Sequence, residues 1–177
     1  MLLTQKQLIV LLCFLFYTLL ALSQNENKGL DNLSFMLGEW KVLTQQKLRN
    51  KSKINESGNA KIEFILKETY LQLKVDLSND NNSRNYLQLI SYDKNQDVFI
   101  SQYLYSGSIM KVYEEGSWNN AEKTLTMNGV NPWADELDKG INIISSIKKI
   151  HNNKFTLSVN EFRDEKWEIG YESTFIR

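Results

Sequence analysis

The chain has very little cysteine, histidine or proline, with one of each among 177 residues. The lone cysteine, Cys13, excludes an internal disulfide framework. The lone histidine, His151, excludes a metal site built from several histidines. The only proline, Pro132, lies outside every expected strand, which agrees with the need of central strands for all their backbone N–H groups. The fold must therefore rest on a packed core.

The chain also has no excess of either charge. It carries 21 lysines and arginines against 21 aspartates and glutamates, a formal net charge of zero. This balance excludes the basic surface that typifies nucleic-acid binding or attachment to an anionic membrane. Hydrophobic residues make up 42% and charged residues 24%, which is an ordinary globular composition. We expect no nucleic-acid partner.

The N-terminus has the pattern of a secretory signal peptide over residues 1–23. One charge, Lys6, precedes an apolar run over 8–22, and Ala21-Leu22-Ser23 has the small-x-small form of a cleavage site. The run is shorter than the roughly 20 residues of a spanning helix, although an uncleaved anchor stays open as an alternative. We expect export to the periplasm or secretion, and no membrane span after cleavage. A polar leader, residues 24–30, follows.

The remainder, residues 31–177, alternates between apolar and polar residues with period two, which predicts strands with one buried face. Polar clusters rich in asparagine and aspartate separate these segments, as expected for turns. No long helical pattern supplies the crossovers that parallel pairing needs. The sequence therefore predicts one all-β domain, an antiparallel up-and-down β-barrel of about ten strands. The expected strands are 40–45, 60–67, 71–77, 85–92, 98–105, 109–118, 123–128, 141–150, 154–162 and 167–177.

A short helix precedes the first strand. Asp31 can cap it, Leu33 and Met36 give it an apolar side, and Gly38 ends it. We expect it to plug the barrel end that holds Trp40, called here the floor end. The opposite end, called the rim end, would then carry the loops 48–58, 78–84, 106–108, 129–140 and 163–166. Long loops at one end of a rigid barrel favour ligand access there.

The alternation also assigns the faces of the last strand. Its inward residues would be Trp167, Ile169, Tyr171, Ser173, Phe175 and Arg177. Arg177 would then meet Trp40 where the barrel closes, and a guanidinium over an indole ring is favourable by about 0.5–2 kcal/mol.

Gly38-Glu39-Trp40 together with a terminal Arg177 resembles the calycin arrangement of lipocalins and fatty-acid-binding proteins. More of the chain is similar to a lipocalin-like group, domain of unknown function family 1579. The matching pieces are Leu37 to Trp40, Tyr92-Asp93, Glu115 to Trp118, Thr124 to Thr126 and Tyr171 to Arg177. The resemblance implies a lipocalin-like barrel over 31–177 and implies no particular activity.

Several polar or aromatic residues are expected to face a cavity near the rim end. Tyrosine and tryptophan offer a large contact area with one hydrogen-bond donor, which suits a small hydrophobic or amphipathic ligand. We expect such a ligand to be bound, with a barrel filled by its own side chains as the alternative. The candidate ligand-binding residues are Gln46, Tyr105, Trp133, Glu161, Trp167 and Tyr171.

Two other functions remain open. An enzyme could use the same cavity with Glu161 or Tyr171 in acid–base chemistry. A structural or interaction module could act through its outer surface, for which Leu43, Ile65 and Ile176 at outward positions are the hints.

The spacing of residues selects no catalytic set, no metal site and no cofactor. Glu114 and Glu115 are adjacent on a strand and so face opposite sides. The acidic cluster Asp135, Glu136 and Asp138 lacks the glycine and terminal glutamate of a calcium loop. Nitrobindins, related ten-strand barrels, hold haem through one histidine, but His151 is expected in a floor turn, away from the cavity.

Overall fold

The computed structural model describes residues 29–48, 52–106, 111–132 and 140–177. Residues 1–23, expected to form a signal peptide, lie outside these ranges. Within them, no helix is long and apolar enough to cross a membrane. One 3₁₀ helix and ten strands follow in chain order: η1 (Gly29–Met36), β1 (Gly38–Lys47), β2 (Lys53–Ile65), β3 (Tyr70–Ser78), β4 (Ser83–Asp93), β5 (Val98–Tyr105), β6 (Lys111–Asn119), β7 (Thr124–Asn131), β8 (Ile141–His151), β9 (Lys154–Arg163) and β10 (Lys166–Ile176).

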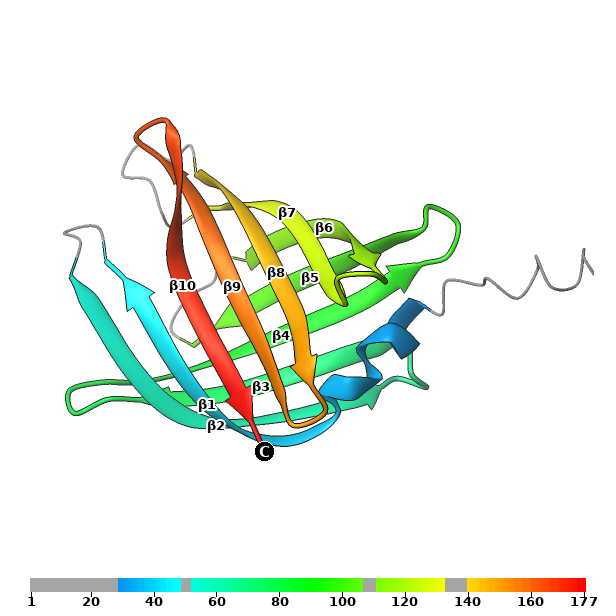
Figure 1. Ribbon diagram of the computed structural model, residues 1–177, viewed down its shortest axis with the longest axis horizontal. Helices are drawn as coiled ribbons and strands as arrows, with labels where there is room; N and C mark the ends of the chain where they lie inside the picture. Colours follow the sequence, from blue (N-terminus) through cyan, green and yellow to red (C-terminus); the bar gives the residue numbers. More distant parts are fainter. Residues whose placement is uncertain (1–28, 49–51, 107–110, 133–139) are drawn as a thin grey trace, which may run out of the picture.

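The strands form one closed barrel. Each strand pairs antiparallel with its neighbours in the sequence, and β1 pairs with β10 to close the sheet (Figure 1). The up-and-down barrel expected from the alternation is therefore confirmed. On β3, Leu71, Leu73, Val75 and Leu77 point inward and are buried, whereas Lys74 between them is exposed.

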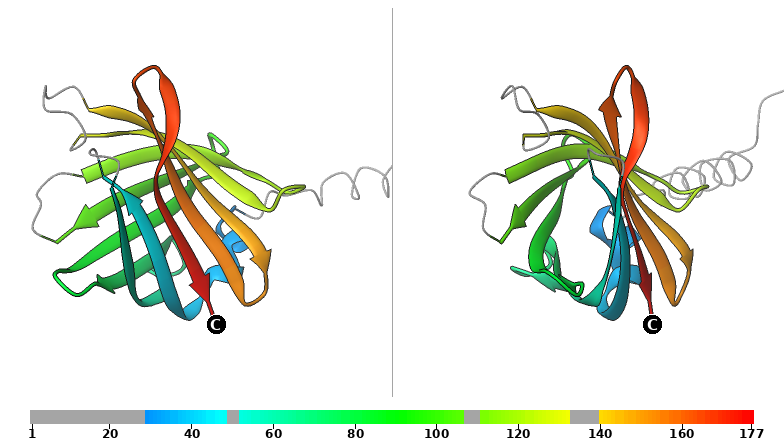
Figure 2. Two further views of the ribbon diagram at one scale, coloured as in Figure 1. Left: turned by 60° about the vertical axis from the view of Figure 1, so that its left-hand side comes forward. Right: turned by 90° about the vertical axis from the view of Figure 1, so that its left-hand side faces the viewer.

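The helix η1 packs against the floor end (Figure 2). Leu33 and Met36 have no exposed surface, and the Trp40 indole Nε1 donates a hydrogen bond to the Met36 carbonyl at 2.6 Å. The Phe35 ring contacts Trp118 and Phe155, which lie at the floor ends of β6 and β9. The expected helical plug is confirmed.

Trp40 and Arg177 meet where β1 and β10 close the barrel. The guanidinium carbon of Arg177 lies 3.9 Å from the centre of the Trp40 ring. The same guanidinium donates a hydrogen bond to the Leu37 carbonyl. Gly38 adopts φ +113°, and a Cβ there would stand 3.2 Å from the guanidinium, so glycine suits both the backbone and the space. The closure inferred from the sequence is present.

The loop expected over 48–58 is mostly strand. β2 begins at Lys53, which pairs with Lys47 of β1. The segment contains few apolar residues because its inward side chain near the rim is Glu56, which is buried and paired with Arg84 of β4. A polar inward residue breaks the apolar alternation on which the expectation depended.

The inward assignment of Trp167 and Ile169 is wrong. The β9–β10 register shifts between Ile169 and Tyr171, a β-bulge at Gly170. An extra residue reverses the faces of every position beyond it. Trp167 and Ile169 are consequently 47% and 53% exposed, on the outer face of a hairpin that projects beyond the neighbouring strands (Figure 1).

We predict that Arg177→Gln lowers the free energy of unfolding by about 1–2 kcal/mol, because it removes the contact with Trp40 and the hydrogen bond to Leu37. Urea unfolding followed by tryptophan fluorescence measures the change. Lys94→Gln, at an exposed turn position, is the control. Equal stabilities for the two variants would show that the Arg177 contact contributes nothing to closure.

Candidate functional site

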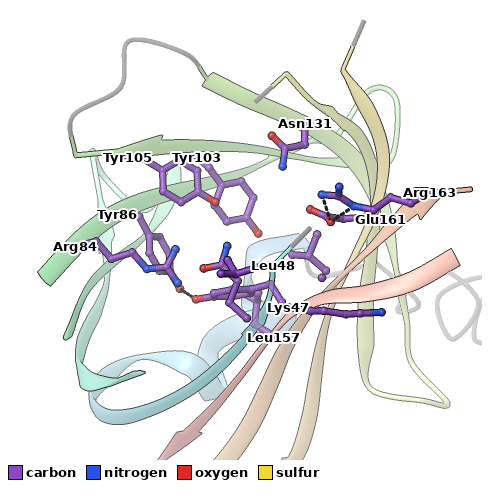
Figure 3. A pocket seen from close by; sticks show the side chains of 14 residues that line it. Lys47, Leu48, Arg84, Tyr86, Tyr103, Tyr105, Asn131, Leu157, Glu161 and Arg163 are labelled. Carbon is purple, nitrogen blue, oxygen red and sulfur yellow. Dashed lines mark hydrogen bonds and ion pairs between the residues drawn. The ribbon is translucent and has the colours of Figure 1, made fainter. Parts of the chain in front are cut away.

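A cavity of about 380 Å³ opens at the rim end of the barrel (Figure 3). Residues from β1, β4, β5, β7, β9 and β10 line it, so it requires the closed barrel. Its walls combine four tyrosine rings with charged groups and a few aliphatic side chains. The lining includes Gln46, Lys47, Arg84, Tyr86, Tyr103, Tyr105, Leu157, Val159, Glu161, Arg163, Gly170 and Tyr171.

Four of the six residues expected at this site, Gln46, Tyr105, Glu161 and Tyr171, line the cavity. Trp167 is not among the lining residues, since the bulge turns it outward, where its ring centre lies 5.3 Å from that of Phe162. Trp133 lies outside the described residues.

Sequence reasoning missed Arg84, Tyr86 and Tyr103. Each was detectable by extending the alternation: Tyr103 is two residues before Tyr105 on β5, and Arg84 and Tyr86 share the inward face of β4 with Ile90. Their polarity conceals them on these two strands, because a pattern read from hydrophobicity marks the inward face by its apolar residues.

Tyr86, Tyr103 and Tyr105 form a cluster. Their ring centres are 5.9–6.3 Å apart, and the rings of Tyr103 and Tyr105 are nearly parallel. The Tyr171 hydroxyl donates to the Tyr86 hydroxyl at 3.5 Å. Burial raises the pKa of Tyr86, Tyr103 and Tyr105, most strongly for the first two, so these phenols are neutral at physiological pH.

Each cationic side chain that lines the cavity has a carboxylate partner. Arg84 donates from Nε to both oxygens of Glu56 at 3.0 Å, and its guanidinium lies 5.6 Å from the centre of the Tyr171 ring. Arg163 Nε donates to Glu161 Oε2 at 2.8 Å.

The third cation, Lys47, pairs with Glu168 of β10. A Glu161 carboxylate already bound by a guanidinium is poorly placed for acid–base chemistry.

Further buried polar side chains lie among the inward residues of β4, β5, β6 and β8. Gln88 donates to the Ser101 hydroxyl at 2.9 Å, and the Ser145 hydroxyl donates to Glu114 Oε1. All four residues are completely buried. Three buried atoms of the described residues have no hydrogen-bond partner: Gln88 Oε1, the Tyr103 hydroxyl and Glu114 Oε2.

Glu114 is the one titratable carboxyl of this buried set. Burial raises its pKa to about 7, although the hydroxyls of Ser145 and Tyr103 act in the opposite direction. The adjacent Glu115 is exposed on the outer face, as the alternation required. Sequence reasoning placed the two on opposite faces but did not identify Glu114 as part of a site. His151 is exposed at a floor turn, as expected.

Comparison with known proteins identifies the family and fold. Residues 26–177 match the family described as "Protein of unknown function (DUF1579)". The structure of Rv2717c from M. tuberculosis is similar at a TM-score of 0.63 and 10% identity, covering 84% of this chain and 96% of that one. The S-type phycobiliprotein lyase CPES from Guillardia theta is similar at 0.58 and 10% identity, covering 85% and 93%. No curated protein matches the chain.

The raised pKa of Glu114 predicts a pH-dependent stability. The folded protein holds this proton up to about pH 7, whereas a glutamate with the ordinary pKa of 4.5 loses it earlier in the unfolded chain. Between about pH 4.5 and pH 7 the folded state therefore binds more protons than the unfolded state. As pH rises through this interval, Glu114 lowers the free energy of unfolding by about 3 kcal/mol in total.

We therefore expect the stability of Glu114→Gln relative to wild type to increase by about 3 kcal/mol between about pH 4 and pH 8. Urea unfolding across this range measures it. Glu115→Gln, at the exposed neighbouring position, should run parallel to wild type. A parallel curve for Glu114→Gln as well would mean that the native carboxyl titrates normally.

Proposed function

Because the chain belongs to the family described as Protein of unknown function (DUF1579) and folds as a lipocalin-like barrel with a cavity at its rim end, we propose that it binds a small amphipathic molecule non-covalently in that cavity. The observation that carries the proposal is the cavity of about 380 Å³ lined by four tyrosine rings. Small-molecule sites fall in the range of about 300–1,000 Å³.

The lining favours an amphipathic rather than a purely apolar ligand. Tyrosine rings offer flat apolar surface and their hydroxyls offer hydrogen bonds, while Leu157 and Val159 add aliphatic surface on β9. Bulky side chains occupy the floor half of the barrel, including Phe155, Phe175 and Trp40. A ligand would therefore occupy the rim half alone.

A cavity-filling substitution tests binding. We expect the neutral fluorescent probe N-phenyl-1-naphthylamine to bind with one-to-one saturation, and Val159→Phe to weaken it at least about tenfold by occupying its space. Val130→Phe is the matched control, because Val130 is 46% exposed outside the cavity. Probe binding that is unaffected by Val159→Phe, or that never saturates, would contradict the proposal.

We also propose that the protein meets its ligand after export, on the strength of the signal-peptide pattern in residues 1–23. Expression of the full chain in an exporting host should yield a protein whose N-terminal residue is Gln24. N-terminal sequencing and intact mass measure this. A chain that retains Met1 in the cell would contradict export.

A further inference from the structure

The cavity proposed to bind a ligand adjoins buried polar atoms without partners. Tyr103 belongs to both groups: it lines the cavity, with its ring directed inward in Figure 3, and its hydroxyl has no hydrogen-bond partner among the described residues. The Gln88 amide oxygen and Glu114 Oε2 are also unpartnered. Both oxygens accept hydrogen bonds, and a buried acceptor without a donor is unfavourable. The Tyr103 hydroxyl is a donor, but it can serve only one of these two acceptors.

The charges near the cavity indicate that the missing donor is cationic. The three cations in its lining already have carboxylate partners: Arg84 pairs with Glu56, Arg163 pairs with Glu161, and Lys47 shares Glu168 with Lys166. Within the described part of the chain, Glu114 has no ion-pair partner, and its hydrogen bond comes from a neutral hydroxyl, that of Ser145. An ionised Glu114 therefore leaves one buried negative charge uncompensated, which is strongly unfavourable.

The tyrosine cluster suits a cation as well. The face of an aromatic ring is negative, so several rings around one space attract an organic ammonium group. Burial keeps the hydroxyls of Tyr86, Tyr103 and Tyr105 protonated, so they do not themselves require a counter-cation. The Arg84 guanidinium already lies 5.6 Å from the centre of the Tyr171 ring.

We propose that the ligand is an organic primary amine, bound with its ammonium group among the tyrosine rings and facing the Tyr103 hydroxyl. One N–H of the ammonium group donates to the Tyr103 oxygen, and the Tyr103 hydroxyl in turn donates to Glu114 Oε2. The new donor thus gives the Tyr103 oxygen a partner and compensates the Glu114 carboxylate through one intervening phenol. This assignment of a ligand class rests on the proposed cavity binding.

Three probes of similar size and different head groups test the class. Tryptamine carries an ammonium group, tryptophol a neutral hydroxyl and indole-3-propionic acid a carboxylate. Isothermal titration of the full chain at about pH 8 should show tryptamine binding at least about tenfold more tightly than either analogue.

Two substitutions locate the preference. Glu114→Gln keeps the shape and removes the charge, so we expect tryptamine binding to weaken at least about tenfold and tryptophol binding to change less than about twofold. Tyr103→Phe should weaken tryptamine binding as well, which covers the case of a Glu114→Gln protein that does not fold. Glu115→Gln and Tyr113→Phe are the matched controls on the exposed outer face.

The pH profile gives a second readout. The groups known to act on the Glu114 carboxyl are Ser145 of β8 and Tyr103 of β5; β7 presents Gly129, without a side chain, opposite Glu114. Tryptamine remains protonated between pH 6 and 8, and Tyr103 remains neutral. As the carboxyl with pKa about 7 ionises, tryptamine binding should strengthen by about tenfold over this interval, and Glu114→Gln should abolish the change.

The outcomes separate this inference from the proposed function. Tryptophol or indole-3-propionic acid binding as tightly as tryptamine would overturn the amine class and leave cavity binding intact. A second result would also overturn the amine class: none of the three indole probes binds, yet N-phenyl-1-naphthylamine binds and Val159→Phe weakens its binding. If Val159→Phe has no effect on any probe, the cavity itself is not the site and the proposed function fails first.

Discussion

The pairing of β1 with β10 is the constraint on which the rest of the structure depends. It joins residues near the start and the end of the described chain, from Lys41 opposite Ile176 to Gln46 opposite Tyr171. Once this pair forms, each of the ten described strands has a partner on both sides, so the barrel has no open edge. The inward side chains then converge on one space, and the contact of Arg177 with Trp40 secures the closure at the floor end.

The interior of the barrel changes character from floor to rim, and β10 displays the change along a single strand. Phe175 stacks on Phe155 with ring centres 4.2 Å apart. Next, Ser173 shares a 2.6 Å hydrogen bond with Thr44 of β1. Then Tyr171 reaches the cavity. Burial of the apolar side chains at the floor end stabilises the folded state. Polar side chains buried below the rim destabilise it unless they have hydrogen-bond partners.

The sequence predicted the fold well because the floor half is apolar. The alternation of Leu71, Leu73 and Val75 requires one buried face, and Trp40 and Arg177 could be paired across the closure from position alone. The candidate site was predicted only in part. Tyr171 was found by following one face of its strand and Tyr105 by its place at the rim end, both of which line the cavity. Tyr103 was not found, and Glu114 was considered only as half of an unsuitable carboxylate pair. Inward polar residues carry no signal in a pattern read from hydrophobicity.

The bulge at Gly170 explains why Trp167 was wrongly expected to face the cavity. An inserted residue reverses the faces, so Trp167 turns outward while the neighbouring Glu168 forms an ion pair with Lys47, which lines the cavity. A Cβ at Gly170 would lie 2.6 Å from the Glu161 carboxyl carbon, so the absence of a side chain makes room for the Glu161–Arg163 pair. The irregularity that defeats the alternation thus positions the charged wall of the cavity. Bulges of this kind depend on packing between strands, which a single strand's sequence does not record.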